Sequence, residues 1–244
     1  MTEGIFLRRP NRFIAEVMVD GRLEKAHVKN TGRCRELLLE GVPVLLEPSG
    51  NPSRKTKYSL INVMKNGQWV NMDSAAPNVV VEEMVREGRL FSDVTRVQRE
   101  KTFRHSRFDL YVETGTEPAR RIYIEVKGVT LEEEGVARFP DAPTERGLKH
   151  IRELEEAVRE GYEAWIVFVI QMKGVTRMEP NMRTQPAFGE ALVKAREAGV
   201  RLAAFDCIVE RESLKTDRPI PVDLSVVKRR GRLDEKEEKE EKIR

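Results

Sequence analysis

The chain has 244 residues, of which 39% are hydrophobic and 35% are charged, and its 44 basic and 41 acidic residues leave a net charge of +3. This length is sufficient for one large domain or two small ones, each with its own core. The near balance of charge excludes a histone-like or polyanionic chain, although it is compatible with a local basic groove.

Three features favour a cytoplasmic protein without a membrane segment. The longest apolar run, Ala164 to Ile170, has the length of a strand, whereas a membrane span needs about 18 apolar residues. The first residues lack the basic region and the apolar block of a signal peptide. The two cysteines, Cys34 and Cys207, are too far apart in the sequence for a disulfide scaffold or a zinc site.

Residues 1–77 are predicted to form a β-rich domain. Apolar runs of strand length lie at residues 13–19, 23–28, 42–46, 58–64 and 69–72. Asp20-Gly21 and Asn66-Gly67 separate neighbouring runs, and such dipeptides are typical of hairpin turns. Short strands in this arrangement indicate a five-stranded OB-like barrel, a fold that binds nucleic acid on one strand face and through the adjoining loops.

Residues 78–228 are predicted to form a second domain of α/β type. The expected helices lie at residues 79–87, 144–159 and 186–198, and the expected strands at 94–103, 107–113, 121–127, 164–170 and 200–205. The order α-β-β-β-α-β-α-β indicates a mixed sheet with helices packed on it. Residues 229–244 mix Lys, Arg and Glu, and we expect them to be a solvated charged tail.

The residues that indicate chemistry are Asp109, Glu125 and Lys127. Glu125 and Lys127 are two positions apart in an expected strand, so their side chains project to the same face. Asp109 interrupts an apolar pattern in the preceding strand, and a hairpin connection brings the two strands together. Two carboxylates converging in this way suit Mg²⁺ or Mn²⁺, and a neighbouring lysine can orient water or balance developing charge.

A simple ion pair, between Lys127 and either Glu125 or Asp109, would explain the same residues without any catalysis. A carboxylate on the preceding helix would be the natural third metal ligand. Glu82 and Glu83 both lie there, and helical periodicity does not separate them.

Longer motifs extend this pattern. The segments Tyr123 to Leu131, Phe139 to Gly147, Asn30 to Arg33 and Asn51 to Lys55 resemble the sugar fermentation stimulation protein A family. The order of elements around Asp109 and Glu125-Val126-Lys127 resembles the PD-(D/E)XK nuclease superfamily.

The resemblance implies an N-terminal OB-like domain followed by a PD-(D/E)XK restriction-endonuclease-like mixed-sheet α/β domain, in a protein that binds DNA. It implies that Asp109, Glu125 and Glu83 hold Mg²⁺ or Mn²⁺ and that Lys127 acts beside them, with Glu83 matching better than Glu82. Two departures are that Lys29 replaces a frequent proline and that Phe108 rather than proline precedes Asp109.

Phosphate contacts are expected from several basic groups. Three candidates lie at the start of the expected long helix, namely Arg146, Lys149 and His150. The others are Arg107 at the end of a basic run, Arg54 and Lys55 in a barrel loop, and Arg33 in the N-terminal motif. Solvated salt-bridge networks are the alternative for each arginine. Phe13 is a candidate for base stacking, although packing in the core is the stronger expectation for it.

Taken together, the sequence predicts a DNA-binding protein with a divalent-metal-dependent phosphodiesterase site. The alternative is a non-catalytic DNA-binding protein, or a transcriptional regulator of sugar metabolism, in which the nuclease-like site is vestigial. The sequence does not indicate an oligomeric state.

Overall fold

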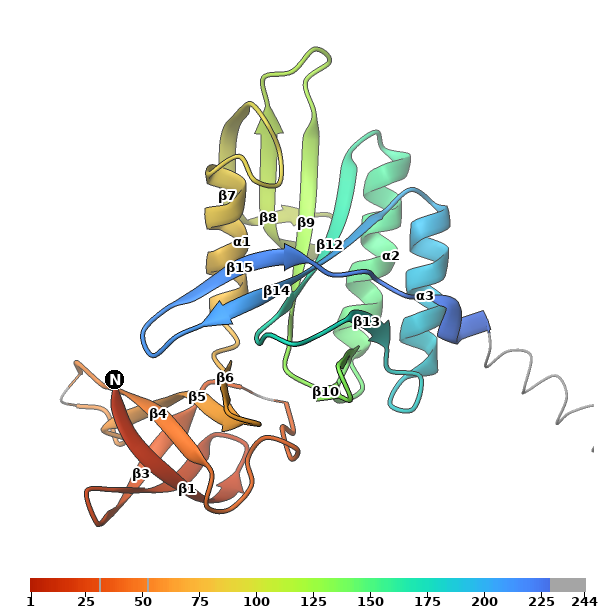
Figure 1. Cartoon of the computed structure of the whole chain (residues 1–244). Coiled ribbons are helices and arrows are strands. Elements are labelled where there is room, and N and C mark those ends of the chain that lie inside the picture. The colour runs from red at the N-terminus through yellow and green to blue at the C-terminus, as the bar shows by residue number, and fades with distance from the viewer. Residues whose placement is uncertain (31, 52, 229–244) are drawn as a thin grey trace, which may run out of the picture.

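The computed structural model describes residues 1–30, 32–51 and 53–228. The charged tail expected at residues 229–244 lies outside these described residues. Figure 1 shows a β-barrel at one end of an α/β domain, with the helix α1 rising from the junction between them.

The N-terminal domain is a closed barrel, as expected. Its strands are β1 (Thr2–Asn11), β2 (Ile14–Val19), β3 (Arg22–Val28), β4 (Pro43–Pro48), β5 (Tyr58–Lys65) and β6 (Gln68–Asn71). They pair in the order β3-β2-β1-β4-β5-β6, and an additional β3–β5 pairing closes a ring of five strands. The hairpin turns at Asp20-Gly21 and Asn66-Gly67 carry positive φ angles of 48° and 73°, and 49° and 78°, which these residue types tolerate.

The second domain contains the elements expected for a mixed-sheet α/β fold. Its helices are α1 (Ala76–Arg86), α2 (Glu145–Arg159) and α3 (Pro186–Glu197). Its large sheet consists of β7 (Val94–Phe103), β8 (Ser106–Thr114), β9 (Arg121–Val129), β12 (Glu163–Ile170), β14 (Arg201–Val209) and β15 (Leu214–Pro219). The strand order is β15-β14-β12-β9-β8-β7, in which β9, β12 and β14 are parallel to one another and the other neighbours are antiparallel.

A small sheet lies beside the large one and was not expected from the sequence. It consists of β10 (Glu132–Glu133), β11 (Val136–Phe139) and β13 (Arg177–Pro180), in that order. These strands are short and polar at several positions, so they lack the apolar alternation by which strands are recognised.

Apolar burial places helices on both faces of the large sheet (Figure 1). On one face, Val81 and Val85 of α1 belong to a buried cluster with Leu110 and Ile124. On the other face, α2 and α3 bury their apolar stripes; the residues of α2 in that cluster include Leu148, Ile151 and Leu154. Because β8 and β9 lie between these helices, side chains on both strands can be reached from α1 and from α2.

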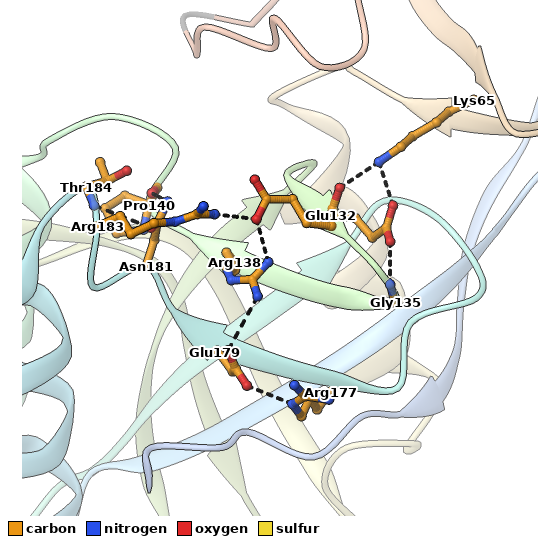
Figure 2. Close-up of polar contacts among 11 residues, drawn as sticks. Lys65, Glu132, Gly135, Arg138, Pro140, Arg177, Glu179, Asn181, Arg183 and Thr184 are labelled. Atoms are coloured by element: carbon orange, nitrogen blue, oxygen red, sulfur yellow. Dashed lines mark hydrogen bonds and ion pairs between the residues drawn. The ribbon is translucent and has the colours of Figure 1, made fainter. Parts of the chain in front are cut away.

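Polar contacts hold the barrel against the α/β domain. The Gln171 amide donates to Asn71 Oδ1 at 2.7 Å and to the Asp73 carbonyl at 3.0 Å. Lys65 of β5 donates to the backbone carbonyl and the carboxylate of Glu132, at 2.7 and 2.5 Å (Figure 2). Asn71 and Gln171 are buried, so breaking these contacts would leave unpaired polar groups in the interior. Among the described residues, no helix has the length and apolarity that a bilayer crossing requires.

Candidate active site

Asp109 of β8 and Glu125 of β9 lie at the end of the antiparallel hairpin that these two strands form, away from its connecting loop. The paired register of β8 and β9 runs up to Leu110, which lies opposite Ile124. Beyond that pair, the backbone N–H of Val126 donates to Asp109 Oδ2 at 2.7 Å. The Asp109 side chain therefore accepts the N–H group of β9 in place of a backbone carbonyl of β8. Asp109 and Glu125 thus lie where the hydrogen-bonded pairing of β8 and β9 ends.

Each carboxylate is oriented by a different helix. Asn78, in the first turn of α1, donates from Nδ2 to Asp109 Oδ1 at 2.9 Å. His150, in α2, places Nδ1 at 2.6 Å from Glu125 Oε1, and Lys127 Nζ lies 2.5 Å from the same oxygen. The helices on the two faces of the sheet thus fix the side chains at the open end of the hairpin.

Glu125 has one oxygen without a partner. The residue is only 4% exposed. Oε1 receives the contacts from Lys127 and His150, whereas Oε2 is buried and has no hydrogen-bond partner among the described residues. A buried carboxylate oxygen without a donor or a cation is costly, and such a group in a native protein calls for an explanation.

The two carboxylates have opposite pKa shifts. Burial raises the pKa of Asp109 to about 6, and the negative charge of Glu125 adds to the increase, while the Val126 N–H, Lys127 and Asn78 oppose it. Burial also acts to raise the pKa of Glu125, but Lys127 and His150 outweigh it, and the net effect is a lowered pKa. The mutual repulsion of the pair would be relieved by a cation placed between them.

These residues fit a divalent cation. Glu125 offers its unpartnered oxygen, and each Asp109 oxygen retains acceptor capacity beyond the one donor it already has. No group of three or more His, Cys, Asp or Glu residues with metal-binding geometry occurs in the part of the chain that the structure describes. A site with two carboxylates and open positions suits Mg²⁺ or Mn²⁺, which keep water and contact substrate phosphate.

Glu83, the expected third carboxylate, is not brought to this pair. It is exposed on α1, whereas Glu82 is buried and held by arginine side chains. Asn78 and Glu82 are four residues apart and share the helix face that packs on the sheet. The α1 residue that contacts Asp109 is therefore an amide, and the assignment of Glu83 as a metal ligand is not supported by the geometry.

The basic candidates divide between two hollows. Arg107, Arg146, Lys149 and His150 line one hollow of ≈ 620 Å³. Arg33 lines a second hollow, of ≈ 550 Å³, between the barrel and the α/β domain. Arg54 and Lys55 line neither of these hollows; they lie in the loop between β4 and β5.

Much of the basic run before Arg107 forms ion pairs, in agreement with the salt-bridge alternative. Arg86 and Arg99 pair with Glu82, and Arg104 pairs with Glu156 of α2 and with the residue that caps its C-terminus, Glu160. Arg107 itself forms an exposed pair with Glu100 at 3.4 Å. An exposed pair of this kind contributes little stability, so Arg107 remains free to exchange its partner for a phosphate.

His150 has a different position from the one expected of a phosphate ligand. It is 5% exposed. Arg146 Nε donates to Nε2 at 3.3 Å, so Nδ1 carries the proton that points to Glu125. Both ring nitrogens are therefore engaged, and His150 orients Glu125 rather than offering a free N–H group.

We expect His150→Ala to lower the free energy of unfolding by about 2 kcal/mol or more, because Glu125 loses one of the two groups that satisfy Oε1. His150→Asn should recover part of this loss, since the Asn Nδ2 lies close to the place of the histidine Nδ1 and can donate to Glu125. Denaturant unfolding of both variants measures the difference. Equal losses in the two variants would show that the contact with Glu125 is not what His150 contributes.

Two residues near the site were not singled out from the sequence. Asn78 was seen only as the beginning of a helical segment, and nothing in the local pattern connects it with Asp109. Arg12 lines the interdomain hollow together with Arg33, but in the sequence it only follows Arg8 and Arg9 in a turn between two strands, and nothing distinguishes it from them. Only the folded arrangement of the chain shows where these side chains lie.

The fold and the site together define a class of protein. A closed OB barrel is joined to a restriction-endonuclease-like mixed-sheet domain, and two carboxylates and a lysine meet at the open end of the central hairpin. Residues 7–72 match the SfsA N-terminal OB domain, and residues 75–213 match the sugar fermentation stimulation protein RE domain. The chain belongs to the sugar fermentation stimulation protein (SfsA) family.

Individual relatives agree with this assignment. A sugar fermentation stimulation protein homolog of Desulfitobacterium hafniense is 54% identical over 222 residues, which cover 91% of this chain and 96% of that protein. A homolog of Clostridium beijerinckii is 52% identical over 212 residues, covering 87% and 92%. Among solved structures, Pyrococcus furiosus SfsA in complex with Ca²⁺ superposes with a TM-score of 0.83 at 30% identity, covering 91% of this chain and 95% of that one.

Proposed function

We propose that this protein is a divalent-metal-dependent phosphodiesterase that acts on nucleic acid, and on DNA in particular. The observation that carries the proposal is the buried, unpartnered Oε2 of Glu125 beside Asp109, whose pKa is raised to about 6. Both features are unfavourable for the protein alone, and both are relieved when a divalent cation is held between the two carboxylates. Ca²⁺ in the related Pyrococcus furiosus structure supports a role for divalent ions in this family.

In this proposal, different residues of the chain hold the metal ion, act on the water or the developing charge, and bind the substrate. Asp109 and Glu125 would hold Mg²⁺ or Mn²⁺, which supplies polarisation of a phosphoryl oxygen and activation of water. Lys127 lies close enough to the pair to orient water or to stabilise charge that develops on the phosphate. Arg146, Lys149 and Arg107 line the adjoining hollow and would hold the phosphate backbone of the substrate.

The proposal is tested by incubating the full chain, freed of metal with EDTA, with labelled single-stranded and double-stranded oligonucleotides. We expect cleavage on addition of Mg²⁺ or Mn²⁺ and none with EDTA alone. Salt-sensitive binding without cleavage under any of these conditions would contradict the proposal and favour the non-catalytic DNA-binding alternative.

A further inference from the structure

The hollow between the two domains has walls from both of them. On the barrel side it is lined by Arg12, Asn30 and Arg33, and on the α/β side by Gly128, Thr130 and Thr144, among others. The Arg33 backbone N–H donates to Asp141 Oδ2 at 2.9 Å and so joins the two walls. The Arg9 guanidinium donates to four backbone carbonyls of the barrel loops at 2.6 to 2.9 Å. The hollow is therefore formed without any ligand.

Two guanidinium groups in this lining are free to bind an anion. Arg12 and Arg33 are exposed, and within the described residues neither side chain makes a hydrogen bond or an ion pair. The third arginine of the lining, Arg138, differs in that it is held by Glu133 and Glu179 of the small sheet. Figure 2 shows its contact with Glu179. Guanidinium groups that lack a carboxylate partner are suited to bidentate contacts with phosphate oxygens.

The hollow also has the size of a small-ligand site. Its volume of ≈ 550 Å³ lies within the range of roughly 300–1,000 Å³ that is typical of sites for small molecules. A site of this size accommodates about one or two nucleotide units of a single strand. A double helix is too wide to enter it, because both strands and the stacked bases between them would have to fit.

The position of the hollow connects it with the carboxylate pair. Gly128 follows Lys127 directly in β9, and Thr144 is the N-cap of α2, two residues before Arg146. The other hollow, lined by Arg146 and His150, begins on the same turn of α2. The residues that contact Glu125 are thus adjacent in sequence to the linings of two basic hollows.

An exposed aromatic residue follows Arg12 in the chain. Phe13, in the turn between β1 and β2, is 51% exposed, contrary to the expectation that it packs in the core. Its carbonyl accepts the N–H of Val28, which fixes the turn close to the Asn30 loop. Phe13 does not line the hollow itself, so its ring offers a stacking surface for an unpaired base outside the hollow, one residue along the chain from Arg12.

We propose that the interdomain hollow binds a single-stranded segment of nucleic acid through phosphate contacts to Arg12 and Arg33. This inference rests on the proposed function, and it narrows the substrate class. The preferred substrate is then a nucleic acid that is unpaired beside the scissile bond, such as a single strand, a flap or a frayed end, rather than a continuous duplex.

Binding is measured by fluorescence anisotropy with the full chain carrying Asp109→Asn, so that no cleavage interferes. The probe is a labelled DNA oligonucleotide, alone or annealed to its complement. We expect Arg12→Gln combined with Arg33→Gln to weaken single-strand binding at least about 10-fold and to reduce the salt slope of log K by about 1.4, as for the loss of two phosphate contacts. Duplex binding should change by less than about 3-fold.

The matched control removes two positive charges at a distance from the hollow. Arg22→Gln with Lys25→Gln changes exposed residues at the beginning of β3, whereas Asn30 follows the end of that strand. The inference is overturned if this control weakens single-strand binding as much as the Arg12/Arg33 variant does, or if that variant binds like the parent. If an RNA oligonucleotide bound more tightly than DNA, and the Arg12/Arg33 variant lost that binding, the result would support the site with RNA as its ligand.

The two proposals can fail separately. Cleavage of duplex and single strand at equal rates, unaffected by Arg12→Gln and Arg33→Gln, would overturn the single-strand inference and leave the phosphodiesterase proposal standing. Single-strand binding that depends on these two arginines, in a protein that cleaves nothing, would support the hollow as a binding site and contradict the hydrolase.

Discussion

Asp109→Asn will reduce Mg²⁺- or Mn²⁺-dependent cleavage of oligonucleotides by at least about 100-fold. The asparagine oxygen can still accept the N–H of Val126, and its amide can donate to Asn78 once the Asn78 amide is flipped. The local geometry is therefore retained, while one of the two negative charges that would hold the cation is lost. Initial rates at saturating metal for wild type and variant measure the effect.

The same variant should be more stable than wild type when no metal is present. The pKa of Asp109 is about 6 in the folded protein and 3.8 for the free residue. The folded state therefore binds more protons in this interval, and stability falls as the pH rises through it. In thermal unfolding with EDTA, the advantage of Asp109→Asn should grow between about pH 4 and about pH 7, and saturating Mn²⁺ should stabilise wild type but not the variant.

Asp20→Asn is the matched control for Asp109→Asn. Asp20 is exposed in the β2–β3 turn, with a φ of 48°, a conformation that asparagine also tolerates. Its cleavage rate, its metal-dependent stabilisation and its pH dependence should be those of wild type. If Asp109→Asn also cleaved at the wild-type rate, the observed cleavage would come from a contaminating nuclease, and Asp109 would have no part in metal binding.

Most elements of the fold could be predicted because they carry a local signal. Two strands are exceptions. β1, from Thr2 to Asn11, fully buries only one side chain, that of Phe6, and it contains Arg8, Arg9 and Pro10, so its sequence lacks the apolar alternation of a strand. β15 is an edge strand with one fully buried residue. Both strands are formed because neighbouring strands offer pairing partners, which a local pattern does not reveal.

The proximity of Asp109 to Glu125 follows from the sequence, because consecutive strands joined by a hairpin lie side by side. The choice between Glu82 and Glu83 does not follow, since it depends on the rotation of α1 against the sheet. The contact of His150 with Glu125 joins residues that are 25 positions apart, and it depends on how α2 packs on the sheet. Sequence patterns thus identify the strands of the site, whereas tertiary packing decides which helical side chains reach it.

Lys127→Met is expected to separate metal binding from the chemical step. Lys127 Nζ lies 2.5 Å from Glu125 Oε1, so its removal takes a competing cation away from the carboxylate. The affinity for Mn²⁺, measured by calorimetry, should be unchanged or higher, while the single-turnover cleavage rate should fall by about 100-fold or more, because the charge that orients water or stabilises the phosphate is lost.

The comparison with Lys25→Met decides what Lys127 does. Lys25 is exposed on β3, and the structure gives its side chain no ion pair among the described residues, so this variant makes the same chemical change without affecting the carboxylates. If Lys127→Met lost Mn²⁺ binding together with cleavage, Lys127 would act by holding Glu125 in place. If Lys127→Met still bound Mn²⁺ but cleaved slowly, and Lys25→Met were unaffected, Lys127 would be assigned to the reaction itself, as its contact with Glu125 Oε1, on the carboxylate whose other oxygen is unpartnered, predicts.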